Sequence, residues 1–174
     1  MTSELTDAKY LLELDNLRDI ITEELRLDAQ IIERSELLPV SSLVITLESD
    51  YKERPRFASL AYLPLSDDEC ESIKLLQFYL AIPCEIKSDF QQAVEKVLLL
   101  INLKAPIGSF TINEESKEVV ARYVYSLGKF KIVDKEEFLE TFMLFMYTVD
   151  QFSGLIEEVA IGIKNYESVY KELL

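Results

Sequence analysis

The chain has 174 residues, of which 49% are apolar and 29% are charged, and its formal net charge is −14. This composition is typical of a globular protein and excludes an intrinsically disordered chain. Because so acidic a chain is repelled by phosphate backbones and anionic membranes, we expect neither nucleic acid nor a membrane as a partner.

The length suits one domain, and no linker separates two halves of about 85 residues each. We therefore expect a single α+β domain over residues 1–174, with residues 154–174 as a helical C-terminal extension. The first residues lack the basic and apolar regions of a secretory signal, and the longest aliphatic run is Val97–Ile101. These features predict a cytoplasmic protein.

A helix is predicted over about residues 4–25. Its apolar residues recur at helical spacing and form one stripe, namely Tyr10, Leu14, Leu17, Ile21 and Leu25. Its acidic residues, Glu13 among them, are expected mostly off that stripe.

Strands are predicted next over residues 43–48, 57–63 and 73–82, with a short edge strand over 28–34. The 73–82 segment is apolar on both faces, which is typical of a central strand. Between the first two strands lie three cationic residues (Lys52, Arg54 and Arg56), which we interpret as a solvated hairpin tip.

Two cysteines, Cys70 and Cys84, flank the stretch from Ser72 to Ile82, which contains the predicted 73–82 strand. Eleven extended residues cover about 35 Å, whereas a disulfide needs Cα atoms within about 7 Å. Both thiols are therefore expected to be reduced.

A second helix is predicted to start at a capping box formed by Ser88 and Gln91, and to end before Ala105, because Pro106 disfavours helical geometry there. Its apolar run at residues 97–101 nearly encircles the helix. A hairpin follows, with strands at residues 110–112 and 119–127.

The last helical run starts at Asp134. Its apolar residues keep one phase past Gly154, so it forms either one long helix or two with a bend; they are Phe138, Phe142, Phe145, Val149, Phe152, Ile156 and Ile163. A helix of about 40 residues would be about 60 Å long, so in a domain of this size it must overhang the sheet, bend back or pack against another molecule.

The predicted order is helix, antiparallel strand meander, helix, β-hairpin and long C-terminal helix, which is an α+β fold.

The chain contains no histidine, which removes the usual general base and metal ligand. Its four glycines match no phosphate-binding loop. The densest acidic cluster lacks the spacing of a calcium loop and is interpreted as a solvated turn; it comprises Asp67, Asp68, Glu69 and Glu71. We therefore predict no enzyme activity and no catalytic, cofactor or metal site.

Three segments stand out within this element order: Leu75-Leu76-Gln77-Phe78-Tyr79, Ile107-Gly108-Ser109-Phe110 and the Phe138, Phe142, Phe145 series. Together with the element order, they resemble the type III secretion chaperone fold, including YbjN-type domains and an uncharacterised cyanobacterial family. The resemblance implies an acidic, dimeric protein that binds extended segments of partner proteins, and it transfers no functional residue.

The leading hypothesis is a non-enzymatic protein-binding module, chaperone-like or adaptor-like and a homodimer, with residues 97–101 and the long last helix as candidate surfaces. One alternative is a small-ligand or sensor domain whose apolar pocket, between the sheet and the last helix, is lined by Tyr123, Phe142 and Phe145. Another is a carboxylate- or metal-dependent enzyme whose acids converge in a cleft.

Overall fold

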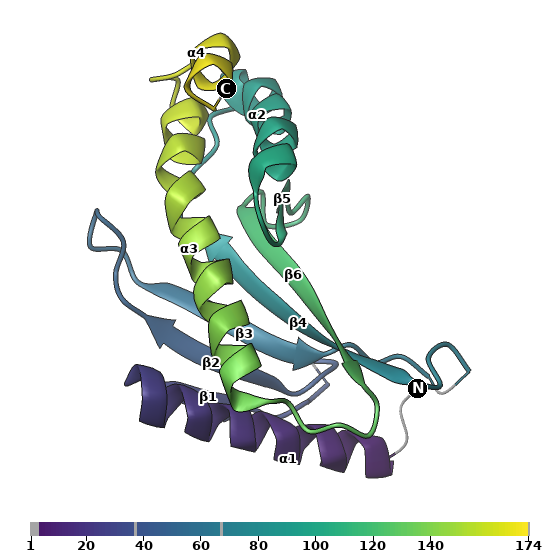
Figure 1. The fold of residues 1–174 in the computed structure, drawn as a ribbon. Helices are drawn as coiled ribbons and strands as arrows, with labels where there is room; N and C mark the ends of the chain where they lie inside the picture. Colours follow the sequence, from purple (N-terminus) through teal and green to yellow (C-terminus); the bar gives the residue numbers. More distant parts are fainter. Residues whose placement is uncertain (1–3, 37, 67, 174) are drawn as a thin grey trace. The chain divides into compact units, whose positions relative to one another are not determined.

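The computed structural model describes residues 4–36, 38–66 and 68–173. The strands within this part of the chain form one antiparallel sheet in the order β1-β2-β3-β4-β6-β5 (Figure 1). Helices precede, interrupt and follow the strands along the chain. The predicted α+β class and element order are confirmed.

The chain divides into two compact units. The first unit comprises Met1–Leu80 and Val124–Phe138, and the second comprises Ala81–Tyr123 and Leu139–Leu174. The boundaries fall inside β4, β6 and α3. The expectation of a single domain stays a prediction.

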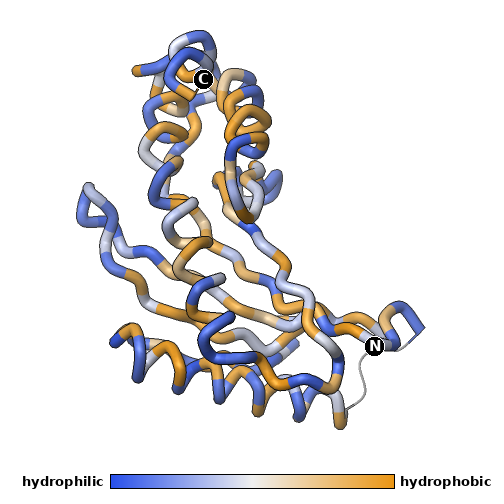
Figure 2. Tube along the Cα trace, in the orientation of Figure 1, coloured by the Kyte–Doolittle hydropathy of each residue, from blue (hydrophilic) through white to orange (hydrophobic). Residues whose placement is uncertain are grey.

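In the first unit, α1 (Glu4–Ile20) continues into a π-helical turn, η1 (Ile21–Leu25), as the predicted 4–25 helix. Hydrophobic and hydrophilic residues alternate along α1 (Figure 2). Its stripe packs against β1, β2 and β3, and Leu14 and Leu17 are fully buried. Burial of each such side chain contributes about 1.5–3 kcal/mol.

The strands of the first unit follow the predicted meander: β1 (Ala29–Ile32), β2 (Ser42–Leu47), β3 (Arg56–Tyr62) and β4 (Ile73–Ile82). The predicted edge strand is β1, and β4 lies inside the sheet between β3 and β6. One face of β4 is fully buried and the other is mostly half-buried, so the two faces are covered less equally than predicted. The buried face includes a charged residue, Lys74.

The loop between β2 and β3 is the predicted hairpin tip. The Arg54 guanidinium lies 2.6 Å from a carboxylate oxygen of Asp50, and Lys52 is exposed. Its charges therefore neutralise one another or face solvent.

In the second unit, the capping box prediction is wrong. Ser88 lies inside a short 3₁₀ turn, η2 (Ser88–Phe90), and α2 (Gln91–Lys104) begins after it with Phe90 at the cap position. The Gln91 side chain donates to Glu95 rather than folding back. The predicted end before Ala105 is confirmed, since Ala105 is extended.

The predicted hairpin consists of β5 (Ser109–Ile112) and β6 (Val119–Gly128). Strand β5 is at the sheet edge, where one side chain of α2 replaces a neighbouring strand: Asn102 donates to the carbonyl oxygen of Phe110 at 3.0 Å and accepts its N–H at 2.7 Å. The Asn102 amide thus satisfies both backbone groups of Phe110.

The C-terminal run forms two helices, α3 (Lys135–Ala160) and α4 (Tyr166–Leu173), so the second of the two alternatives holds, and α3 is the predicted long C-terminal helix. The break is at Gly162 rather than at Gly154. Gly162 has φ 83°, and a Cβ there would lie 2.2 Å from the Phe90 ring, which only glycine allows. Ile163 follows the break and is 68% exposed, so its predicted place in the stripe is also wrong.

Cys70 and Cys84 are both free thiols, as predicted.

Candidate functional site

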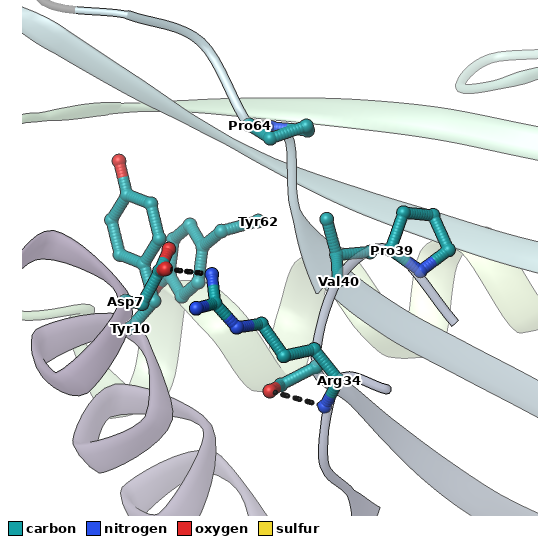
Figure 3. Close-up of a pocket in the computed structure, with 8 residues that line it drawn as sticks. Asp7, Tyr10, Arg34, Pro39, Val40, Tyr62 and Pro64 are labelled. Atoms are coloured by element: carbon teal, nitrogen blue, oxygen red, sulfur yellow. Dashed lines mark hydrogen bonds and ion pairs between the residues drawn. The ribbon is translucent and has the colours of Figure 1, made fainter. Parts of the chain in front are cut away.

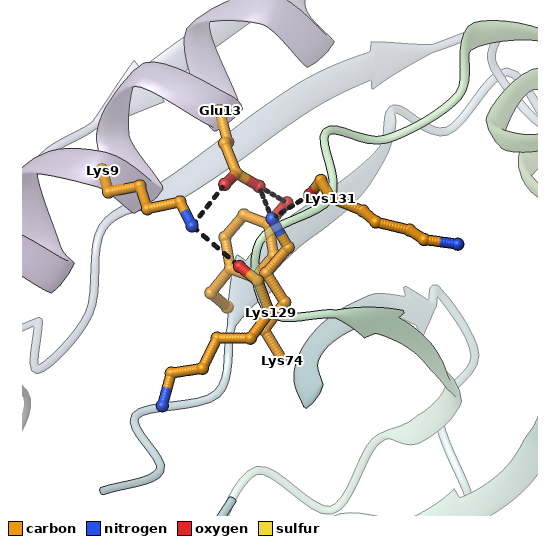
Figure 4. Close-up of polar contacts among 6 residues, drawn as sticks. Lys9, Glu13, Lys74, Lys129 and Lys131 are labelled. Carbon is orange, nitrogen blue, oxygen red and sulfur yellow. Dashed lines mark hydrogen bonds and ion pairs between the residues drawn. The ribbon is translucent and has the colours of Figure 1, made fainter. Parts of the chain in front are cut away.

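A cluster of charged side chains lies beneath α1 in the first unit. Helix α1 supplies Lys9 and Glu13, β3 supplies Tyr62 from its last residue, and β4 supplies Lys74 (Figure 4). Glu13 and Lys74 occupy core-facing positions of their elements, and the Lys74 side chain is 0% exposed. Helix α1 and strand β4 therefore bring opposite charges together in the interior, and β3 adds a hydroxyl group.

The Glu13 carboxylate is the centre of this cluster. Its Oε2 accepts the Lys74 ammonium and, at 2.6 Å, the Tyr62 hydroxyl. The Lys74 ammonium also donates to the carbonyl oxygen of Lys131 at 2.7 Å, in the loop between β6 and α3. One carboxylate thus links α1, the sheet and this loop.

A second lysine, Lys9, also connects α1 to the segment around Phe130. The Lys9 ammonium donates to the carbonyl oxygen of Lys129 at 2.7 Å and lies 5.4 Å from the centroid of the Phe130 ring. It is 3.9 Å from Glu13 Oε1, a buried oxygen without a hydrogen-bond partner in the described residues. The ammonium therefore meets a carboxylate, a carbonyl and an aromatic ring.

Burial has the largest effect on the pKa values of Lys74 and Tyr62. Desolvation lowers the pKa of Lys74, and the hydrogen bond and charge of Glu13 partly oppose that change. Burial, followed by the hydrogen bond to Glu13, raises the pKa of Tyr62 above its usual range. Because these polar atoms are buried and engage one another, the arrangement is suited to holding segments together.

An open groove of about 740 Å³ lies beside Lys9. Three of its apolar side chains are largely exposed: Leu5 at 82%, Leu12 at 72% and Phe130 at 86%. We call it the Phe130 groove, and it is lined by Leu5, Thr6, Ala8, Lys9, Tyr10, Leu12, Glu71, Lys129 and Phe130. Apolar surface of this kind marks binding sites more often than isolated exposed residues do.

A smaller pocket of about 30 Å³, which Tyr10 also lines, lies where Asp7 pairs with Arg34 (Figure 3). The Tyr10 and Tyr62 rings stack there with centroids 4.4 Å apart. The pocket has room for about one water molecule but not for a larger ligand.

The predicted surface at residues 97–101 is mostly interior. Val97, Leu98, Leu100 and Ile101 are buried, and Leu99 is 69% exposed. With Leu103 at 82% exposure, it leaves a narrow exposed ridge on α2.

The residues proposed to line a pocket near the last helix lie in the second unit. Phe142 and Phe145 are each 1% exposed, while Tyr123 is half-buried. A Cβ on Gly108 would lie 3.4 Å from the Phe145 ring, so that ring packs closely against the start of the hairpin.

The acidic cluster at 67–71 is a surface turn where described; Asp67 lies outside the described residues. Glu69 accepts hydrogen bonds from the backbone and side chain of Ser66, and these bonds lower its pKa. Across residues 4–36, 38–66 and 68–173, no three acidic or cysteine side chains are grouped as a metal site. Nor does any helix there combine the length and apolar character needed to cross a bilayer.

No family model and no curated protein matches this sequence. The resemblance to type III secretion chaperones therefore stays a prediction carried by element order and apolar patterns.

The sequence analysis missed the residues that build the site, although a signal exists for two of them. Glu13 is in phase with Tyr10, Leu14 and Leu17, and Lys74 shares the strand periodicity of the buried residues of β4. Opposite charges at two core-facing positions are a pattern that could have paired them. Phe130 carries no such signal, because its groove depends on a helix about 120 positions earlier.

Proposed function

We propose that this chain is a non-enzymatic protein-binding module, chaperone-like or adaptor-like, whose Phe130 groove receives apolar side chains of a partner segment. The observation that carries the proposal is the exposure of Leu5, Leu12 and Phe130 around one groove of about 740 Å³. Covering these side chains would remove apolar surface from water at a site shaped to accept it.

The charges of the groove favour a partner with acidic residues beside its apolar ones. The groove presents two cations, Lys9 and Lys129, and one anion, Glu71, in a chain whose net charge is −14. A carboxylate beside an inserted apolar side chain would meet an ammonium at the rim. A second copy of this chain would bring another 14 negative charges, so we favour a different protein over a homodimer.

The small-ligand alternative has weaker support at its predicted location. Phe142 and Phe145 are buried, and Phe145 packs against the hairpin. The Phe130 groove, of about 740 Å³, lies in the first unit.

Selection from a random peptide display library on the full chain tests this proposal. We expect enriched peptides with two or three apolar residues next to Asp or Glu. A selected peptide, followed by fluorescence polarisation, should bind the Phe130→Ser variant about tenfold or more weakly, as for a central interface aromatic.

The matched control is Leu99→Ser, which removes an exposed apolar side chain of the second unit and should leave affinity unchanged. Equal binding by Phe130→Ser together with lost binding by Leu99→Ser would contradict the assignment. So would a library that enriches nothing on a chain that light scattering shows to be a dimer.

A further inference from the structure

We infer that Glu13 is the positioning residue of the Phe130 groove. Through Lys9 and Lys74 it fixes the backbone on both sides of Phe130, and so it sets the position of the Phe130 ring, which we call the wall of the groove. The role in binding rests on the proposed function, whereas the positioning itself follows from the contacts.

Each of the two backbone carbonyl groups that flank Phe130 accepts a hydrogen bond from a lysine ammonium group. The carbonyl of Lys129 precedes Phe130 and accepts the Lys9 ammonium at 2.7 Å. The carbonyl of Lys131 follows it and accepts the Lys74 ammonium, also at 2.7 Å. The backbone is therefore held on both sides of Phe130 by charged donors, which make stronger hydrogen bonds than neutral ones.

Both lysines converge on one carboxylate. Glu13 Oε2 pairs with Lys74, and Glu13 Oε1 lies 3.9 Å from Lys9. Without this anion, the two ammonium groups would lack their common counter-charge, and Lys74 would be buried without an acidic partner.

The Phe130 side chain contributes little to fixing its own position. It is 86% exposed, so its own burial contributes little order. The turn around it has other supports, since Lys129 N–H donates to Ser72 and Lys131 N–H donates to Gly128, both at 2.9 Å. Loss of Glu13 is therefore expected to loosen the wall without unfolding the loop.

The chain has no tryptophan, so a Phe130→Trp substitution places a single fluorophore on the wall. Time-resolved anisotropy of this tryptophan reports the motion of the wall without any ligand. We expect faster and wider motion when Glu13→Gln or Lys9→Met is added. Lys9→Met keeps the test decisive if Glu13→Gln folds poorly, because the Lys9 side chain is 42% exposed.

The control is Glu24→Gln, a matching change in the same unit. Glu24 pairs with Lys135, and that pair makes no hydrogen bond to the carbonyls beside Phe130. Tryptophan motion should be unchanged in this variant.

Binding is measured separately with a display-selected peptide and an unmodified Phe130. Glu13→Gln should weaken affinity about threefold to tenfold, since the peptide would then have to order the wall. Equal tryptophan motion in the parent, Glu13→Gln and Lys9→Met would overturn the inference. Loosened motion with no peptide binding to the unsubstituted chain would instead retain the positioning role and reject the proposed function.

Discussion

The two units stabilise their interiors with different chemistry. The first unit buries a lysine paired with a glutamate beneath α1, whereas the second buries a carboxylate, Glu157, among aromatic and aliphatic side chains and satisfies a strand edge with a neutral amide, Asn102. A buried ion pair is often no more stabilising than apolar packing, but it requires specific partners and distances. The first unit thus uses a buried ion pair to fix a surface loop, whereas the second fixes its helices mainly by apolar packing, with its ion pairs of Lys164 with Glu158 and Glu172 nearer the surface.

The largest effect is expected from breaking the charged interior. Lys74→Ala should lower the free energy of unfolding by about 3–5 kcal/mol, because Glu13 would remain buried without its main cation. Urea unfolding followed by circular dichroism measures this. The double variant Glu13→Leu with Lys74→Met should recover most of the loss, and a double variant as unstable as Lys74→Ala would show that the charges themselves stabilise the unit.

Two glycines of the second unit provide the next test. Gly162→Ala should cost about 1–3 kcal/mol from the left-handed backbone alone, and the Phe90 ring must also move. Gly154→Ala should stabilise α3 by about 0.5–1 kcal/mol, since no atom lies within 4 Å of the new Cβ. Thermal unfolding compares the two, and equal midpoints would contradict our placement of the helix break.

The same comparison shows how far sequence reasoning extends. Apolar periodicity predicts α1, the meander and the hairpin, because burial of one face determines those elements. It did not distinguish Gly154 from Gly162, since the close approach of the Phe90 ring to Gly162 comes from a residue about 70 positions away in the chain. It also missed the site, because charged residues such as Glu13 are normally assigned to solvent unless a partner is known.

A smaller loss is expected at the β5 edge. Asn102→Ala should cost about 1–3 kcal/mol, because the N–H and carbonyl of Phe110 lose their partner. The newly open edge should also favour self-association, which analytical ultracentrifugation detects. Asn102→Asp can accept the N–H but cannot donate, so we expect an intermediate loss; a loss equal to that of alanine would mean that the donated bond carries the effect.

The smallest effect is expected at the hairpin tip. Burial raises the pKa of Asp50, but hydrogen bonds from the Arg54 side chain and from the backbone amides of Arg54 and Lys52 outweigh it and lower the pKa to about 2 from 3.8. The stabilisation is therefore present above pH 3.8 and is lost as the pH falls toward 2. Asp50→Asn should reduce the slope of stability against pH in this window, and an unchanged slope would contradict the assignment.

The central claim is that partner binding occurs at the Phe130 groove of the first unit. Its most direct test is a titration of the isotope-labelled chain with a display-selected peptide, followed by backbone amide chemical shifts. Our account predicts that the largest shifts cluster at Leu5, Lys9, Leu12 and Phe130. Shifts concentrated at Leu99 and Leu103 on α2, with none around Phe130, would contradict it.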